Sequence, residues 1–299
     1  GINAEYGEMT IRSNFEPYDK KWLTVPSDCF KLVRTPSYGN VQLFSTGNGT
    51  QQKILLIPDL NMPISTYAPF FKCVANDFCV SSVDLLGQGR SDAVQLNLYT
   101  LQDMVEQYLF IIDYLGWSAA RFHVICHGFG CAIGAQLCKS QELTRNILSL
   151  NMFGPTLNSF VRFKPDIVKA KGCMCQADIS NYDIQKLYYE REFSSYSVEQ
   201  QAIFKQEFDK QVSLEFMERF KFFMEKFDHN LQATMEGIQH VPKVKVYLIK
   251  DDCFVDYEAD KKFFSKFEAI ELEKTRHSIF QLNPSIVGDI IRDVVQNYE

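Results

Sequence analysis

Hydrophobic runs of strand length alternate with amphipathic segments along two parts of the chain, residues 28–155 and residues 241–299. The apolar runs 53–60 and 78–87 are continuous, which is typical of strands buried on both faces of a parallel sheet. The segment 100–115 places hydrophobic residues three and four positions apart and predicts a helix. Such alternation predicts an α/β fold in which helices cover a mostly parallel sheet.

Local signals mark the ends of several elements. The apolar segments 29–35 and 41–46 flank a turn that includes Gly39, and they predict an antiparallel hairpin. Thr100 precedes the helix and can cap it, with Asp103 three residues further on. Further strands are expected at 121–126, 146–153, 244–252 and 269–277, and further helices at 131–143, 257–267 and 283–298.

The middle of the chain has a different character. It lacks proline between residues 166 and 241 and glycine between residues 173 and 236, so it should be helical. Phenylalanines recur there at spacings of three and four, and we interpret them as the buried face of a helical insertion, although some rings could line an apolar ligand pocket. The chain is thus divided into an N-terminal extension, a core of two parts and a helical insertion, at 1–27, 28–155 with 241–299, and 156–240.

Composition restricts the classes of function. The 299 residues carry a formal net charge of −6, which argues against general binding to nucleic acids or to anionic membranes. No apolar run reaches the roughly 18 residues that span a bilayer, and the polar residues 1–22 do not resemble a secretory signal. The nine cysteines are an odd number, and several fall within predicted strands or helices. This pattern favours a reducing compartment, and we expect a cytoplasmic protein.

Three groups that could take part in catalysis lie at the ends of predicted strands. They are a glycine turn around Gly128, the acid pair Asp251 and Asp252, and His277. Ligands of open parallel sheets bind beyond the carboxyl ends of the strands, where all three groups are expected. Their order along the chain is the order of nucleophile, acid and histidine in α/β-hydrolases.

The chain resembles the cap-bearing branch of the α/β-hydrolase superfamily from about residue 30 onward. The resemblance rests on four stretches, FCVSSVDLLGQGRSDA, FHVICHGFGCAIG, VPKVKVYLIKDDCFV and EKTRHSIFQLNP. It implies an α/β-hydrolase fold with a helical cap, whose catalytic acid aligns with Asp252 and whose catalytic histidine aligns with His277. It also implies that Gly128 stands at the nucleophile position and that the backbone amides of Leu60 and Phe129 belong to the oxyanion hole.

Two departures from the family pattern decide the functional interpretation. The family's nucleophile turn reads G-x-S-x-G, but residues 126–130 read C-H-G-F-G, so Gly128 offers no oxygen to form an acyl-enzyme. Asp59 lies near the expected oxyanion hole, where the family often has a histidine–glycine pair. A carboxylate at that place would repel the negative charge that develops during acyl transfer, unless it points away.

Other groups could replace the missing serine. Cys126 and Cys131 flank the turn, and a thiolate at the start of a helix is activated by the helix dipole. Neither cysteine lies at the apex, and buried apolar filler is the simpler interpretation of both. Ser91 and Ser278 are weaker candidates, and a water activated by His277 is a further alternative.

We expect no cofactor and no metal. The glycines of the turn and of the following helix spell G-x-G-x-x-x-G, a weak dinucleotide pattern. The next strand, however, offers Asn151 where a dinucleotide site has an acid. No cysteine–histidine spacing predicts a zinc site, and we expect His127 to be packed in the core rather than catalytic.

The sequence leaves two functions open. The first is a pseudoenzyme that binds a small apolar ligand beneath the cap or a protein partner, because Gly128 leaves the nucleophile position vacant. The second is an active hydrolase of small apolar ester-like substrates, which uses His277 and Asp252 with water or a flanking cysteine. A designed Ser→Gly substitution at position 128 would leave the same pattern.

Overall fold

A computed structural model describes most of the predicted core and little of the predicted insertion. The described residues are 10–12, 27–60, 62–143, 145–156, 192, 194, 196–199, 201–202, 231–238, 241, 243–252 and 254–298. The expected helical insertion, with its stripe of phenylalanines between residues 204 and 227, therefore lies almost entirely outside the described residues.

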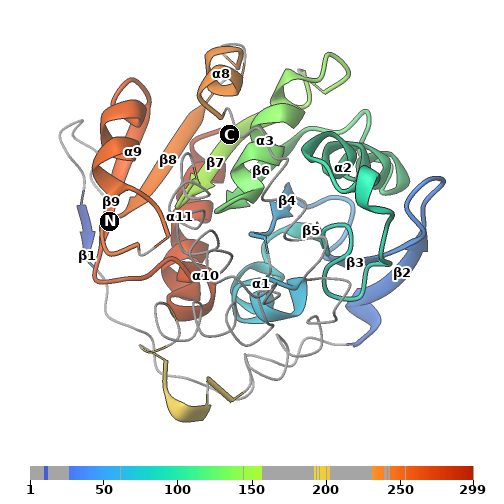
Figure 1. The fold of residues 1–299 in the computed structure, drawn as a ribbon, viewed down its shortest axis with the longest axis horizontal. Coiled ribbons are helices and arrows are strands. Elements are labelled where there is room, and N and C mark those ends of the chain that lie inside the picture. The colour runs from blue at the N-terminus through green and yellow to red at the C-terminus, as the bar shows by residue number, and fades with distance from the viewer. Residues whose placement is uncertain are drawn as a thin grey trace, which may run out of the picture.

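One sheet organises the described part of the chain. Its nine strands follow the order β1-β9-β8-β7-β6-β4-β5-β3-β2, with β1 and β2 at the two edges (Figure 1). The strands are β1 Thr10–Arg12, β2 Phe30–Arg34, β3 Asn40–Thr46, β4 Lys53–Ile57, β5 Cys79–Val83, β6 Phe122–His127, β7 Ile147–Phe153, β8 Val244–Ile249 and β9 Glu268–Glu273.

The pairing confirms the predicted architecture. β4 pairs in parallel with β5 and β6, and β6, β7, β8 and β9 continue the parallel series. β2 and β3 form the predicted antiparallel hairpin, in which Phe30 faces Phe44. β1 was not predicted: within the expected N-terminal extension, Thr10–Arg12 pairs in parallel with the end of β9. The predicted strand 269–277 is too long, because β9 ends at Glu273 and His277 lies in the following loop.

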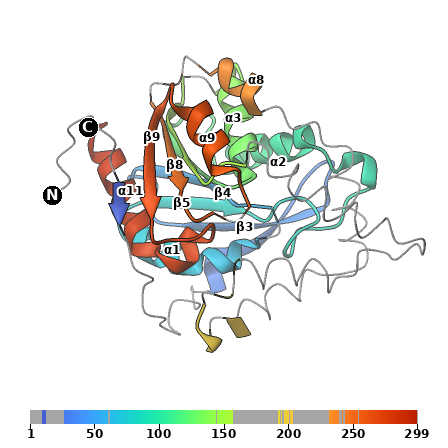
Figure 2. The same ribbon diagram turned by 60° about the vertical axis from the view of Figure 1, so that its left-hand side comes forward.

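Helices cover both faces of the sheet (Figure 1 and Figure 2). One hydrophobic cluster packs α1, α10 and α11 on one face, and a second cluster packs α2, α3, α8 and α9 on the other. These helices are α1 Ala68–Val74, α2 Leu101–Tyr114, α3 Gly130–Lys139, α8 Leu231–Glu236, α9 Tyr257–Phe264, α10 Ile279–Leu282 and α11 Pro284–Gln296. The short 3₁₀ helices are η2 Ser27–Cys29, η3 Ile64–Tyr67 and η4 Leu96–Leu98.

Burial and capping explain why these segments form. Every residue of β5, β6 and β7 is buried, as expected for strands with helices on both faces. The hydroxyl of Thr100 accepts a hydrogen bond from the amide of Asp103 at 3.1 Å, which confirms the predicted cap of α2. Pro284 occupies the first turn of α11, where its missing N–H has no intrahelical partner to lose. The elements that carry the predicted site are therefore held by a continuous core.

Candidate functional site

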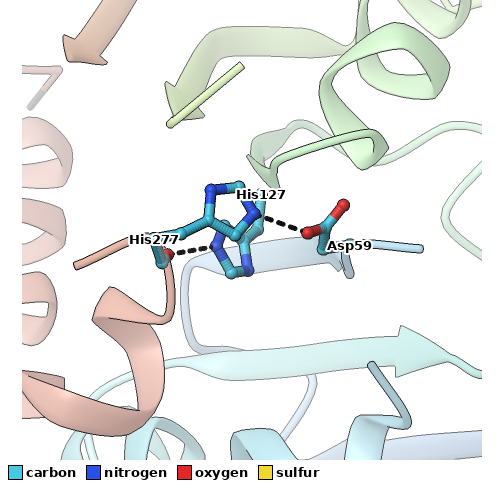
Figure 3. A group of neighbouring side chains, drawn as sticks. All are labelled: Asp59, His127 and His277. Atoms are coloured by element: carbon cyan, nitrogen blue, oxygen red, sulfur yellow. Dashed lines mark hydrogen bonds and ion pairs between the residues drawn. The ribbon is translucent and has the colours of Figure 1, made fainter. Parts of the chain in front are cut away.

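The carboxyl ends of four strands bring the predicted site residues together. Asp59 follows β4, Gly128 follows β6, Asp252 follows β8 and His277 follows β9. Figure 3 shows Asp59 and His277 meeting beside His127, which is the last residue of β6. The topology explains this meeting, because the ends of parallel strands share one edge of the sheet.

Asp252 binds one nitrogen of His277, as the resemblance implies. Its Oδ2 lies 2.6 Å from Nδ1 of His277, and both side chains are buried. The other oxygen, Oδ1, accepts a hydrogen bond from the amide of Phe254 at 2.8 Å. Asp252 therefore fixes the orientation of the imidazole ring and faces its Nδ1 proton. Its neighbour Asp251 is exposed and has no part in this contact.

Asp59 binds the other nitrogen of His277, which sequence reasoning did not predict. Its Oδ2 lies 2.6 Å from Nε2 of His277 (Figure 3). Its Oδ1 accepts hydrogen bonds from the amides of Leu60 at 2.8 Å and Phe129 at 2.7 Å. The two amides that the resemblance assigns to the oxyanion hole therefore both donate to Asp59 in this structure. The carboxylate points into the site rather than away from it.

Gly128 makes room for this carboxylate. A Cβ atom added to Gly128 would lie 2.3 Å from Cγ and Oδ1 of Asp59 and 2.6 Å from its Oδ2. The backbone of Gly128 also has φ +54°, a left-handed conformation that favours glycine. Any side chain at position 128 therefore collides with Asp59 as it stands. The Asp59 carboxylate occupies the space in which a nucleophile on the turn would lie.

The electrostatics make Asp59 and His277 an ion pair. Burial opposes the charge on Asp59, but the adjacent His277 outweighs it and lowers the pKa of the carboxyl. Burial likewise opposes the charge on His277, but Asp252 and Asp59 outweigh it and raise the pKa of the imidazole well above 6.5. Both shifts favour the charged forms, an imidazolium at His277 paired with a carboxylate at Asp59.

His127 and Tyr67 support this arrangement from below. The Nε2–H of His127 donates to the carbonyl oxygen of His277 at 2.6 Å, and the hydroxyl of Tyr67 donates to Nδ1 of His127 at 2.7 Å. The Tyr67 hydroxyl in turn accepts from the amide of Asp59 at 2.9 Å. Burial lowers the pKa of His127 to about 4, so its ring is neutral. As expected, His127 is a packed and hydrogen-bonded core residue.

The same residues lie close enough together to raise the question of a metal ion. Ligand atoms of Asp59, His127 and His277 all fall within 4.8 Å of one another. Both ring nitrogens of His127 are engaged, however, because Nε2 carries a proton towards a carbonyl and Nδ1 accepts from Tyr67. The ring therefore has no free lone pair for a cation. Hydrogen bonding accounts for the proximity of these groups.

Glu192 belongs to the expected insertion and reaches the site. Its Oε1 accepts from the amide of Ser278 at 2.6 Å and from the Ser278 hydroxyl at 2.5 Å. Burial raises the pKa of Glu192, and the neighbouring His277 partly opposes this effect. Sequence reasoning missed Glu192, because no motif marks a carboxylate whose partners lie far along the chain. The contact also engages Ser278, one of the proposed substitutes for the serine nucleophile.

The remaining candidate nucleophiles are buried. Cys126, Cys131 and Ser91 are 0%, 0% and 8% exposed. Burial, followed by the neighbouring Cys126, raises the pKa of Cys131 well above 9.0, so the thiol is not activated by its place in the first turn of α3. The hydroxyl of Ser91 donates to the carbonyl of Asp84 and stabilises the loop after β5. The predicted use of the cysteines as buried filler agrees with these surroundings.

Comparisons with solved structures identify the fold. The chain aligns with a carboxylesterase from Nitrososphaera gargenis at 15% identity and a TM-score of 0.69, over 89% of this chain and 98% of the other. It aligns with 2-hydroxy-6-oxo-6-phenylhexa-2,4-dienoate hydrolase from Rhodococcus sp. strain RHA1 at 14% identity and a TM-score of 0.70, over 89% and 99%. An enol-lactonase from Burkholderia xenovorans LB400 aligns at 17% identity and a TM-score of 0.69, over 86% and 96%.

These structural neighbours are α/β-hydrolase-fold enzymes, and the chain has that fold. The sequence matches no protein-family model and no curated protein. At such low identities the likeness establishes the fold and leaves the chemistry to the site itself. No helix that the structure describes has the length and hydropathy needed to cross a bilayer.

Proposed function

We propose that this chain is a pseudoenzyme of the α/β-hydrolase fold, which acts by binding a ligand or a protein partner. The observation that carries the proposal is the position of the Asp59 carboxylate. It lies above Gly128, accepts from the amides of Leu60 and Phe129, and binds Nε2 of His277. Three components of acyl transfer, the nucleophile, the oxyanion donors and the base, are thereby replaced or occupied.

The proposal follows from what each component needs. A histidine base must be neutral and must face the proton that it removes. The pKa of His277 is raised well above its usual value of 6.5, which favours the protonated ring, and Asp59 and Asp252 bind its two ring nitrogens. An oxyanion hole must offer free N–H groups to the developing charge. Here the N–H groups of Leu60 and Phe129 already donate to the carboxylate of Asp59.

The alternative of an active hydrolase has weaker support. A water activated by His277 would have to sit at Nε2, which Asp59 occupies at 2.6 Å. Thiol attack would need an ionised and accessible cysteine, but Cys131 is buried and its pKa is raised. Both routes require the site to rearrange before chemistry, whereas the pseudoenzyme requires no change.

We further propose where the ligand or protein partner would bind. Residues 156–240 would form the cap, and a small apolar ligand beneath it or a protein partner would be the bound species. Glu192 supports the placement of this segment over the strand ends, because it binds Ser278 next to His277. We also propose a cytoplasmic location, on the basis of the cysteine content and the negative charge.

Labelling with a serine-reactive fluorophosphonate and turnover of p-nitrophenyl acetate test the proposal. The natural chain should show neither reaction. The double variant Asp59→Gly/Gly128→Ser restores an oxygen on the turn and vacates the two amides, so it should be labelled at the introduced serine. The single variant Gly128→Ser retains the obstructing carboxylate and should be labelled at least tenfold more slowly. Efficient turnover by the natural chain that disappears in His277→Ala would refute the proposal.

A further inference from the structure

We infer that the amide N–H groups of Leu60 and Phe129, together with Nε2 of His277, form a receptor for a small carboxylate, in which Asp59 is a ligand supplied by the chain itself. We call these three donors the carboxylate site. The inference rests on the proposed function for the absence of a nucleophile, but it concerns binding alone. It assigns a ligand class to the carboxylate site, namely monocarboxylates of the size of acetate or formate, which bind there once the side chain of Asp59 has been truncated.

The three donors match the two oxygens of one carboxylate. Oδ1 of Asp59 receives the two amides at 2.8 and 2.7 Å, and Oδ2 receives the imidazolium at 2.6 Å. Hydrogen bonds from an ionised donor to an ionised acceptor are about twice as strong as neutral ones. Phe129 also immediately precedes α3, whose ten residues add a partial positive charge at this end. A bound carboxylate is therefore favoured by both geometry and charge.

The donors are held in place by groups other than the Asp59 side chain. Asp252 orients the imidazole of His277, and His127 holds its carbonyl oxygen. The turn beneath Phe129 is fixed by the amide of Gly128, which donates to the carbonyl of Phe153 at 2.9 Å. Removal of the Asp59 carboxylate should consequently leave a preorganised site that lacks its ligand.

In the natural chain a free carboxylate cannot compete. A group tethered next to its binding site has an effective concentration far above that of any solute. Truncation of Asp59 removes the tethered carboxylate, and the size of the truncation sets the size of the free anion that can bind in its place. Asp59→Gly removes the Cβ and the carboxylate, which together correspond to acetate. Asp59→Ala keeps the Cβ and leaves room for formate only.

Thermal unfolding of the full chain in sodium acetate, sodium formate or sodium chloride, at equal ionic strength and pH 6.5, tests the inference. Acetate should raise the Tm of Asp59→Gly by about 2–4 °C over chloride at ten times its Kd. Formate should raise the Tm of Asp59→Ala, and acetate should not. The natural chain and Asp59→Asn, whose side chain still fills the site, should respond to neither anion. Acetamide, a neutral analogue of acetate, should have no effect on Asp59→Gly.

Three results would overturn the inference. They are equal stabilisation of Asp59→Gly by acetate and acetamide, an acetate response in Asp59→Asn, or no response of either truncated variant. If a truncated variant is unfolded in chloride, recovery of its circular dichroism in its matching anion is the expected result, and failure to recover counts against the inference. None of these results depends on turnover, so they are separate from the hydrolysis test of the proposed function.

Discussion

The carboxylate of Asp59 lies where the side chain of residue 128 would begin: a Cβ on Gly128 would be 2.3 Å from Cγ of Asp59. The two positions are therefore mutually exclusive, since a side chain on the turn requires Asp59 to leave. The absence of a serine at position 128 and the presence of the Asp59 carboxylate on the neighbouring loop therefore depend on each other. The site is therefore filled and internally hydrogen-bonded.

The first prediction concerns this steric exclusion. Gly128→Ala should destabilise the chain more than Gly116→Ala, by about 1–3 kcal/mol of unfolding free energy. Both glycines have a positive φ, +54° and +70°, so both substitutions carry the same backbone strain of about 1–2 kcal/mol. A Cβ on Gly116 meets nothing within 4 Å, however, whereas one on Gly128 meets Asp59. Urea unfolding of both variants measures the difference, and equal losses would show that Asp59 moves aside freely.

The second prediction concerns pH. The pKa of His277 is raised above its unfolded value near 6.5, so its stabilising effect is complete below pH 6.5 and is lost as the pH rises through the folded pKa. Unfolding free energy should fall by up to about 1.4 kcal/mol per pH unit in that range. Asp59→Asn removes one of the two carboxylates that raise this pKa, so the decline should end at a lower pH. Urea titrations between pH 6 and pH 9 compare the two chains.

Two buried histidines should lower the unfolding free energy as the pH falls below 6.5. They are His127 and His123, which also lies in β6, and burial lowers the pKa of each to about 4. The unfolded chain takes up protons at these residues below pH 6.5, whereas the folded chain does not, so stability falls as the pH drops from 6.5 towards 4. The depressed pKa of Asp59 acts in the same sense below pH 3.8, the ordinary pKa of this carboxyl group. Maximum stability is therefore expected near pH 6.5, and a steady rise up to pH 9 would contradict these assignments.

Much of the fold could be predicted because its signals are local. The continuous apolar run at β4 indicates a strand buried on both faces, and Thr100 with Asp103 marks the start of α2. The chain order and strand ends of Asp252 and His277 indicated that they would meet. The edge strand β1 escaped prediction because three residues paired at the rim of a sheet leave no periodic pattern.

The role of Asp59, by contrast, could not be read from the sequence. Its presence beside the oxyanion hole was visible, but its effect depends on a side-chain direction that is set by distant residues. Tyr67 holds its backbone amide, and the vacancy at Gly128 admits its carboxylate. The sequence marks Gly128 and Asp59 as separate departures from the family pattern, and the three-dimensional structure shows that the carboxylate of Asp59 fills the space left at Gly128.

The third prediction concerns the contact between the expected cap and the core. Glu192→Ala should lower the unfolding free energy by about 1–3 kcal/mol, because it leaves the buried amide and hydroxyl of Ser278 without this acceptor. Glu199→Ala is the matched control: Glu199 is exposed, and its removal should change stability by less than about 0.5 kcal/mol. Hydrogen exchange should also accelerate at the amide of Ser278 in Glu192→Ala only. Unchanged protection there would show that Glu192 does not hold this loop.

The last prediction tests whether a cysteine beside the turn is chemically active. Cys29 and Cys73 are partly exposed, whereas Cys126 and Cys131 are fully buried. Alkylation by iodoacetamide requires an accessible thiolate, and burial raises the pKa of Cys131 well above 9.0. In the native protein at pH 8, peptides with Cys73 should therefore be modified at least tenfold faster than peptides with Cys131, as measured by mass spectrometry. Denaturation in urea provides the control, because it should make the two rates similar. Rapid native modification of Cys131, together with an esterase activity that Cys131→Ala abolishes, would favour thiol catalysis over the proposed pseudoenzyme.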